Sequence, residues 1–282
     1  MKIVRTVAEL RGVVREAKRD GKSVGLVPTM GAFHEGHLAL MRRAGEECDV
    51  VIVSLFVNPA QFNEAADLAR YPRDEERDVS LAGGAGVDVI FAPPVEEVYP
   101  AGFSTTVDVD ALAQPLEGVV RGVQHFRGVA TVVAKLLNMV QPEVAFFGQK
   151  DAQQALLIRR MVRDLDVPVR IEVCPTVREA DGLAMSSRNV LLDAESRRRA
   201  PALSRALFAV EQSVAAGERD AERALASGRA VLASEGIETE YFTAVDAGTL
   251  LPVQAIERET LVPIAARFGS VRLIDNVIIR PS

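Results

Sequence analysis

The sequence predicts an α/β fold with a doubly wound parallel sheet and a smaller α+β domain at its C-terminal end. Apolar runs of strand length alternate with helical segments as far as residue 173. The run Val50–Val57 is almost continuously apolar, as in strands that a parallel sheet buries on both faces. From Asp193 onwards the pattern changes, with two helical segments followed by strand-like runs. Together these observations favour two domains of different architecture.

The first elements form one βαβ unit. Thr6 and Glu9 have the spacing of a capping box, which predicts a helix to about Arg19. A turn, a strand at 24–27, a helix containing Leu38 and Met41, and the strand at 50–57 follow. The alternation continues with a helix from about 73, a strand at 87–91, a helix at 129–139, a strand at 144–147, a helix at 152–165 and a strand at 169–173.

The remaining elements belong to the second domain. We predict helices at about 194–216 and 218–235, and strands at 238–245, 260–266 and 271–279. The predicted domains span residues 1–182 and 183–282, with a linker near 180–192.

Composition favours a small-molecule partner in a reducing compartment. The chain has 282 residues, 48% of them hydrophobic, which is enough for a substantial core. A net charge of −6 and a pI near 5.3 argue against a general nucleic-acid or anionic-membrane surface. Because the charged start lacks an apolar signal region and Cys48 and Cys174 lack CxxC spacing, we expect a cytoplasmic protein with reduced thiols and no membrane segment.

The segment from Val27 to His37 connects the first clear parallel strand to a helix. Open α/β sheets bind ligands at this end of their strands. Gly31 and Gly36 allow a nucleotide to approach the backbone, and the helix start offers N–H groups to phosphates. His34 and His37, three residues apart, can point the same way and donate to phosphate oxygens.

Two other interpretations of the histidine pair remain open. The rings can serve as core or helix-capping groups, or they can bind zinc. A zinc site needs further ligands, and only His125, the two cysteines and scattered carboxylates are available. Phosphate binding is therefore favoured.

Further polar residues follow the next strands. Asn58 and Gln61 are neutral donors and acceptors suited to a small polar substrate, although Asn58 also suits a simple proline-containing turn. Among only five lysines, Lys150 is the one placed at a carboxyl strand end, where it can offset negative charge on a polyphosphate. Asp151, next to it, can equally cap the following helix.

A last polar group lies in the linker. Ser186 and Ser187 supply hydroxyl donors, and Arg188 can grip a phosphate in a fork. The same residues are ordinary turn composition, so by themselves they indicate little. A mobile loop at this place could close over a site.

Four motifs together resemble the pantothenate synthetase (pantoate–β-alanine ligase) family of the HxGH nucleotidyltransferase superfamily. They are Pro-Thr-Met-Gly-x-x-His-x-Gly-His from Pro28, Phe-Val-Asn-Pro-x-Gln-Phe from Phe56, Gly-x-Lys-Asp-x-Gln-Gln from Gly148, and Met-Ser-Ser-Arg-Asn from Met185. The resemblance extends from Thr6 to the Arg272–Asn276 element. It implies a Rossmann-like fold and the ATP-dependent condensation of (R)-pantoate with β-alanine through a pantoyl-adenylate, with Mg²⁺ on the phosphates.

The resemblance also implies residue roles. Catalysis is carried over to His37, His34, Lys150 and Arg188. ATP binding is carried over to Met30, Gly31, His34, Gly36, His37, Gly148, Lys150, Asp151, Val177, Met185, Ser186, Ser187 and Arg188, and substrate binding to Gln61, Asn58 and Gln154. The Mg²⁺ ligands are not identified. A homodimer is expected by analogy.

Two segments depart from the family pattern. Residues 121–124 replace the usual lead-in to His125, whose role is structural or functional, and residues 63–67 replace a glycine-rich turn. Two rival functions are a nucleotidyltransferase that acts on a phosphorylated acceptor and a nucleotide sensor. The neutral Gln61 and Gln154 count against a phosphorylated acceptor, which would need more arginine or lysine.

Overall fold

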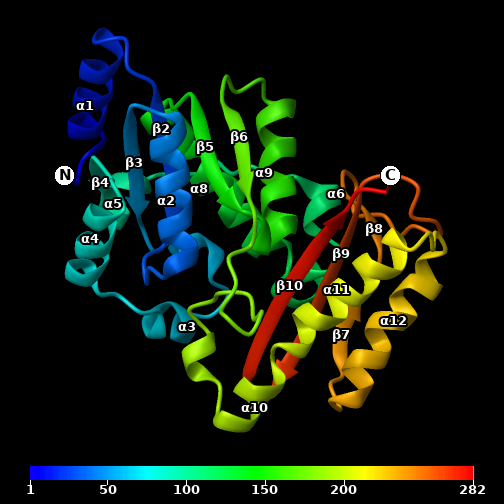
Figure 1. Ribbon diagram of the computed structural model, residues 1–282. Coiled ribbons are helices and arrows are strands. Elements are labelled where there is room, and N and C mark those ends of the chain that lie inside the picture. Colours follow the sequence, from blue (N-terminus) through cyan, green and yellow to red (C-terminus); the bar gives the residue numbers. More distant parts are fainter. Residues whose placement is uncertain (282) are drawn as a thin grey trace. The chain divides into compact units, whose positions relative to one another are not determined.

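The computed structural model describes residues 1–281 and divides them into two compact units (Figure 1). The first unit comprises Met1–Gly148 and Gln153–Pro175. The second comprises Gln149–Ala152 and the chain from Thr176 onwards. The boundary in the structure therefore falls between residues 175 and 176 rather than at the predicted 182/183, and the four residues 149–152 join the second unit.

The first unit is built on a six-stranded parallel sheet in the order β1-β4-β3-β2-β5-β6. The strands are β1 Lys2–Val4, β2 Val24–Thr29, β3 Val50–Leu55, β4 Val89–Phe91, β5 Val144–Gly148 and β6 Arg170–Cys174. From β2 the chain winds towards β4 on one side, and β5 and β6 lie on the other. This arrangement confirms the predicted doubly wound sheet and places its topological switch point between β2 and β5.

Helices connect these strands. They are α1 Val7–Arg19, α2 Glu35–Glu47, α3 Ala65–Arg70, α4 Glu75–Gly84, α5 Val95–Val98, α6 Asp110–Ala113, α7 Glu117–Arg121, α8 Val123–Val140 and α9 Ala152–Asp164, with 3₁₀ turns η1 Pro59–Gln61 and η2 Gln149–Asp151. The predicted capping box is confirmed, because the Thr6 hydroxyl accepts from the Glu9 amide at 3.2 Å and the Glu9 carboxylate accepts from the Thr6 amide at 3.0 Å. Figure 1 shows α2 in front of the sheet, where Met41 and Ala44 enter a core with Val27 and Phe146.

Strand β1 was not predicted. It forms because it pairs with residues that lie far away in the sequence. Only Val4 of its three residues is buried, so the segment has no apolar period of its own. Its pairing with Val89–Phe91 of β4 supplies the ladder that makes it a strand. Likewise, α8 begins at Val123, six residues before the predicted start, and the added turns already bury Phe126 and Gly128.

The second unit combines three helices with an antiparallel sheet. Its helices are α10 Ala194–Arg199, α11 Ala202–Ala215 and α12 Ala221–Ser234, preceded by the 3₁₀ turn η3 Asn189–Leu191. Its strands are β7 Thr239–Phe242, β8 Val245–Asp246, β9 Thr260–Phe268 and β10 Val271–Ile279, in the order β10-β9-β7 with β8 also paired to β9. The predicted α+β architecture is thus confirmed.

Two predictions for this unit were wrong in detail. The single helix expected over 194–216 is two helices, because Pro201 lacks an N–H and cannot continue the α10 ladder. The strand expected over 238–245 is split into β7 and β8, and the pairing of β7 with β9 shifts register between Thr239 and Tyr241.

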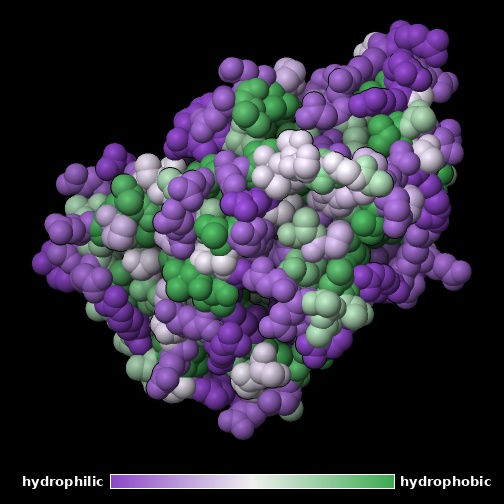
Figure 2. Space-filling model, turned by 180° about the vertical axis from the view of Figure 1, so that it is seen from behind, coloured by the Kyte–Doolittle hydropathy of each residue, from purple (hydrophilic) through white to green (hydrophobic). Residues whose placement is uncertain are grey.

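On the face shown in Figure 2, hydrophobic residues form several groups between hydrophilic ones, which is normal for proteins that expose about 55–60% apolar area. Among residues 1–281, no helix has the length and apolarity needed to cross a bilayer. Cys48 and Cys174 are buried free thiols, and burial raises the pKa of Cys174 to about 11.

Candidate active site

The structure divides the predicted site residues between the two units. The first unit carries Met30, Gly31, His34, Gly36, His37, Asn58, Gln61, Gly148 and Gln154. The second unit carries Lys150, Asp151, Val177, Met185, Ser186, Ser187 and Arg188.

In the first unit the two histidines lie at the start of α2, directly after the carboxyl end of β2. His34 is the N-cap residue, and its Nδ1 accepts a hydrogen bond from the Gly36 amide at 3.1 Å. Nδ1 of His37 lies 3.4 Å from the His34 amide, and the ring centroids are 4.2 Å apart. The capping interpretation is therefore confirmed for Nδ1 of both rings. These contacts use Nδ1 and involve no Nε2 atom.

A buried carboxylate holds the loop that precedes these histidines. Gly31 and Ala32 both have left-handed backbone, with φ of 91° and 54°. Oδ2 of Asp78 accepts from the Ala32 amide and Oδ1 from the Phe33 amide, each at 2.8 Å. Asp78, on α4, is only 1% exposed. It stabilises a conformation that an alanine rarely adopts.

Sequence reasoning missed Asp78. The signal that was available is its position on α4, where it shares the buried face with Ala82 four residues later. A carboxylate on the apolar face of a helix needs buried donors, and this one finds them 45 and 46 residues earlier in the chain.

Asn58 holds Gln61 in place. Asn58 is 1% exposed and donates from Nδ2 to the Gln61 Oε1 and to the Gly128 carbonyl, both at 3.1 Å. Its Oδ1 accepts from the Ala60 amide at 3.2 Å and from the Tyr99 hydroxyl at 2.8 Å. All the hydrogen-bonding groups of the Asn58 side chain are thus used within the first unit.

Gln61 in turn contacts Met30. The amide nitrogen Nε2 of Gln61 lies 2.9 Å from the Met30 sulfur, so the ends of β2 and β3 meet through these side chains. Met30 also lines a cavity of about 290 Å³ together with Leu55, Phe56 and Asp78. The structure therefore brings Met30, Asn58 and Gln61 together, as the shared sheet edge predicts.

Tyr99, which follows α5, was also missed. Burial raises the pKa of its hydroxyl to about 12, so the group stays protonated and remains a donor to Asn58 at neutral pH. Its nearest partner in the site lies 41 residues away in sequence, and no local pattern marks that pairing.

His125 and Gly128 serve the same turn from α8. His125 Nδ1 lies 2.8 Å from the Gln61 carbonyl, so this nitrogen is the donor and carries the proton. A Cβ on Gly128 would stand 2.2 Å from the Ala60 carbonyl oxygen, which only glycine avoids. Both residues thus support the backbone of η1, a structural role for His125.

The two adjacent glutamines of α9 differ in their surroundings. Gln153 is buried and bridges the Leu112 and Pro115 carbonyls and the Glu117 amide at 2.8, 2.8 and 3.0 Å. Gln154 is half-buried, and its side chain makes no hydrogen bond to another residue between 1 and 281. Only Gln154 therefore has amide groups available to a ligand.

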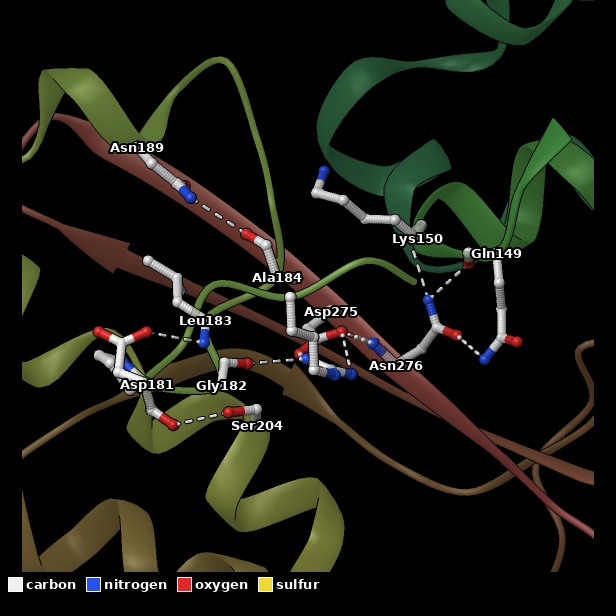
Figure 3. A network of polar contacts seen from close by, with 12 residues as sticks. Gln149, Lys150, Asp181, Gly182, Leu183, Ala184, Asn189, Ser204, Asp275 and Asn276 are labelled. Atoms are coloured by element: carbon white, nitrogen blue, oxygen red, sulfur yellow. Dashed lines mark hydrogen bonds and ion pairs between the residues drawn. The ribbon is translucent and has the colours of Figure 1, made fainter. Parts of the chain in front are cut away.

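In the second unit, Lys150 is anchored through its backbone. The Asn276 amide nitrogen donates to the Gln149 carbonyl at 2.9 Å and to the Lys150 carbonyl at 3.0 Å. Figure 3 shows the Lys150 side chain extended away from Asn276. Within the described chain the Lys150 ammonium makes no ion pair or hydrogen bond.

The segment from Val177 to Met185 forms a tight antiparallel turn. The Met185 amide donates to the Val177 carbonyl at 2.9 Å, and Arg178 pairs with Ala184. The guanidinium of Arg178 binds both carboxylate oxygens of Asp275, at 2.6 and 3.1 Å. Burial raises the pKa of Asp275, while the charge and hydrogen bonds of Arg178 oppose that rise.

The Ser-Ser-Arg segment continues from this turn. Oγ of Ser186 accepts from the Arg188 amide at 3.3 Å, and the Asn189 amide donates to the Ser186 carbonyl at 3.0 Å. Ser187 and Arg188 are exposed, so their side chains are accessible to a ligand. Asn189 donates from Nδ2 to the Ala184 carbonyl at 3.1 Å and to Glu179 at 2.6 Å, which fixes the base of the loop.

A preformed metal site is not found among the described residues. No three His, Cys, Asp or Glu side chains of residues 1–281 gather in a way that could hold an ion. In this part of the chain no third His, Cys, Asp or Glu side chain joins the His34–His37 pair.

Comparison with known proteins agrees with this geometry. The family model of the pantoate-beta-alanine ligases matches residues 2–278. The chain is 52% identical to the pantothenate synthetase of Pelotomaculum thermopropionicum over 280 residues and 54% identical to that of Cereibacter sphaeroides over 276, and covers 98–99% of both chains in each case.

Solved structures give the same result. The crystal structure of pantothenate synthetase from Thermus thermophilus has a TM-score of 0.92 at 49% identity, with complete coverage of both chains. The ligase from Francisella tularensis, complexed with beta-gamma ATP and beta-alanine, has a TM-score of 0.79 at 34% identity, again over both complete chains. The chain therefore belongs to the pantoate–β-alanine ligase family and is an ATP-dependent enzyme that joins pantoate to β-alanine.

Proposed function

We propose that the enzyme binds the phosphates of ATP at the start of α2 and activates (R)-pantoate there as pantoyl-adenylate. The observation that carries this proposal is the pair His34 and His37 at the N-terminus of a 13-residue helix, at the switch point between β2 and β5. The helix end favours anions, and the two Nε2 atoms are suited to donate to phosphate oxygens. His37 is the histidine to which we assign proton donation.

Lys150 and Arg188 supply the positive charge. As β-γ pyrophosphate leaves, negative charge grows on its oxygens, and a nearby ammonium or guanidinium stabilises that charge. Lys150 is suited to this role because its ammonium forms no salt bridge within the described chain and is therefore not held by another side chain. Ser186 and Ser187 add hydroxyl donors, while Met30, Gly31, Gly36, Asp151, Val177 and Met185 complete the ATP contacts that we propose.

Gly148 supports the same proposal from the first unit. Its backbone is not left-handed, and a Cβ at this position would meet nothing within 4 Å. Neither strain nor packing within the protein therefore requires a glycine at the end of β5. Close approach of the nucleotide to the backbone accounts for it.

We assign the pantoate subsite to Gln61 and Gln154. Both are neutral amides that suit the hydroxyl and carboxylate groups of a hydroxy acid. Because the amide of Asn58 is fully engaged within the protein, we propose that it acts on the substrate by fixing Gln61. Neutral amides at this subsite also disfavour a phosphorylated acceptor, which would need more arginine or lysine.

The reaction then needs two displacements. The pantoate carboxylate attacks the α-phosphorus, which forms the acyl-adenylate and expels pyrophosphate. The amine of β-alanine attacks the acyl carbon, which gives pantothenate and AMP. The protein contributes position and charge rather than a covalent intermediate. Mg²⁺ would neutralise phosphate charge, and it fits a site without a cluster of three protein ligands because it is usually held by substrate phosphates, waters and only one or two carboxylates.

We also propose a cytoplasmic location and a homodimeric assembly. Reduced, buried cysteines support a cytoplasmic enzyme. The family resemblance supports a homodimer, and sedimentation equilibrium at micromolar concentration tests it, since a purely monomeric mass contradicts it.

Pantoate-dependent exchange of radiolabelled pyrophosphate into ATP tests the proposed reaction. Exchange that requires pantoate and proceeds without β-alanine is expected, because adenylate formation precedes the amine. Exchange that does not respond to pantoate would exclude the adenylate step. Pyrophosphate release supported only by a phosphorylated acceptor would indicate a nucleotidyltransferase, and ATP binding without any turnover would indicate a sensor.

A further inference from the structure

Asn276 lies on β10, 126 residues after Lys150, yet it contacts the lysine segment directly. It is 3% exposed, and its Nδ2 bridges the carbonyls of Gln149 and Lys150 at 2.9 and 3.0 Å. Its Oδ1 accepts a hydrogen bond from the side-chain nitrogen Nε2 of Gln149 at 3.3 Å. Figure 3 shows these three contacts converging on one side chain. Asn276 thus uses both amide hydrogens to hold a two-residue stretch of backbone.

The asparagine itself is fixed by its neighbour. Oδ1 of Asp275 accepts a hydrogen bond from the backbone N–H of Asn276 at 2.8 Å. The same carboxylate is paired with Arg178. Asp275 is 3% exposed, and Arg178 also donates to the Gly182 carbonyl at 3.2 Å. Asp275, which holds Asn276, is therefore buried and is itself fixed by Arg178. Such secondary contacts are what rigid positioning of a side chain requires.

The lysine segment needs such support. Residues 149–152 pack with the second unit, while the residues on both sides of them belong to the first. Gln149–Asp151 is a single 3₁₀ turn, which has few hydrogen bonds of its own. The Lys150 side chain has no ion pair among residues 1–281 that would hold it in one position. Its location is therefore set by its backbone, which Asn276 holds.

We infer that Asn276 is a positioning residue for Lys150, which fixes the backbone from which the lysine reaches the phosphates of ATP. The inference rests on the proposed role of Lys150. Asn276 does not touch the reacting atoms, so its removal should act only through the lysine. A displacement of about 1 Å at a charge-stabilising group can lower a rate by roughly a hundredfold.

A double-mutant cycle on pyrophosphate exchange tests this inference. Asn276→Asp keeps the size of the side chain but replaces two donors with a carboxylate facing two carbonyls, and Asn276→Ser removes the reach without adding charge. We expect either change to lower exchange by about tenfold or more in the otherwise unchanged enzyme. In a Lys150→Ala background the same changes should lower it by less than about twofold, because the group they position is gone.

The control variant is Asn138→Asp. Asn138 is an exposed asparagine on α8 whose Nδ2 donates to the Ala134 carbonyl at 2.8 Å, so it undergoes the same chemical change at a helix backbone. It should leave exchange unchanged. Thermal unfolding of every variant is recorded, and the rates are compared at a temperature at which all are folded.

The possible outcomes distinguish a failure of the proposed function from a failure of the positioning role of Asn276. If the unmodified enzyme shows no pantoate-dependent exchange, the proposed function fails. If it exchanges and the Asn276 variants match it, the positioning role is wrong. If the Asn276 variants lower the rate by the same factor with Lys150 and with alanine at that position, Asn276 supports the fold in general, and the inference is overturned. Only a loss confined to the lysine-containing enzyme supports it.

Discussion

The Tyr99 hydroxyl donates a 2.8 Å hydrogen bond to Oδ1 of Asn58, whose Nδ2 in turn donates to Gln61. Three side chains from different parts of the first unit therefore form one chain of donors. The proposed substrate ligand, Gln61, lies at its end. The amide of a glutamine can point either way, and this chain decides its orientation.

We predict that Tyr99→Phe weakens pantoate binding. Loss of the hydroxyl removes one partner of a buried amide oxygen, which costs about 1 kcal/mol, so the KM for pantoate should rise by roughly threefold to tenfold. The KM for ATP should not change, since no ATP residue contacts Tyr99. Steady-state kinetics with each substrate varied in turn provides the measurement. Equal rises in both KM values would contradict the proposed chain.

Gly31→Ala should destabilise the loop before His34 by more than the cost of its left-handed backbone alone. A Cβ there would lie 2.8 Å from a Leu55 methyl and 2.9 Å from the Asp78 carboxylate, so the carboxylate that holds the loop must shift. We expect a loss of unfolding free energy of about 2–4 kcal/mol from strain and overpacking together, and a strongly reduced exchange rate.

Gly21→Ala is the matched control. Gly21 also has left-handed backbone, with φ of 72°, but a Cβ there would meet nothing within 4 Å. It should lose about 1 kcal/mol of stability and keep normal exchange. The interpretation fails if both variants have the same exchange rate.

His37→Ala and Lys150→Ala should each impair adenylate formation while the fold remains intact. Removal of one stabilising donor from a preorganised site lowers turnover by about a hundredfold to a thousandfold. Pyrophosphate exchange measures the first step, and circular dichroism with thermal unfolding checks the fold. Near-normal exchange in both variants would refute the phosphate assignment.

We predict that the Glu218 carboxylate makes the stability of the second unit depend on pH in the acid range. Its pKa is lowered from 4.5 to about 2, first by the hydrogen bond from Arg223 and then by the amides of Asp220 and Arg219. Because the folded pKa lies below the unfolded one, this stabilisation is present above pH 4.5 and is lost as the pH falls towards 2.

Glu218→Gln should therefore be less stable than the unmodified protein at pH 7, and the gap should close between about pH 4.5 and 2. Urea unfolding at a series of pH values gives the two profiles. A gap that stays constant over this range would show that the hydrogen bonds at Glu218 do not favour its charged form.

Much of the architecture was predictable because its signals are local. The Thr6–Glu9 capping box, the apolar run that became β3 and the strand-to-helix passage at His34 each lie within a dozen residues. Helix and strand periodicity follow from such short-range patterns. The conclusion that an open α/β sheet binds its ligand at carboxyl strand ends then needed only the order of the elements.

What could not be predicted depends on contacts between distant residues. Asp78 and Asn276 bind backbone that lies 45 and 126 residues away, and the hydrogen-bonding capacity of a side chain does not say where its partner is. The isolated β1 became a strand only by pairing with β4. The linker prediction missed the boundary because the turn at 177–185 packs as part of the second unit.

The second unit is discontinuous in sequence, and this limits how the protein can be dissected. A fragment that starts at Thr176 would contain Asn276 but lack Gln149 and Lys150, whose carbonyls accept from its amide. Such a fragment would expose two hydrogen-bond donors that the whole chain satisfies. Separate expression of the C-terminal portion should therefore require a peptide spanning residues 149–152 to restore its native packing, which makes the lysine segment a candidate for fragment complementation.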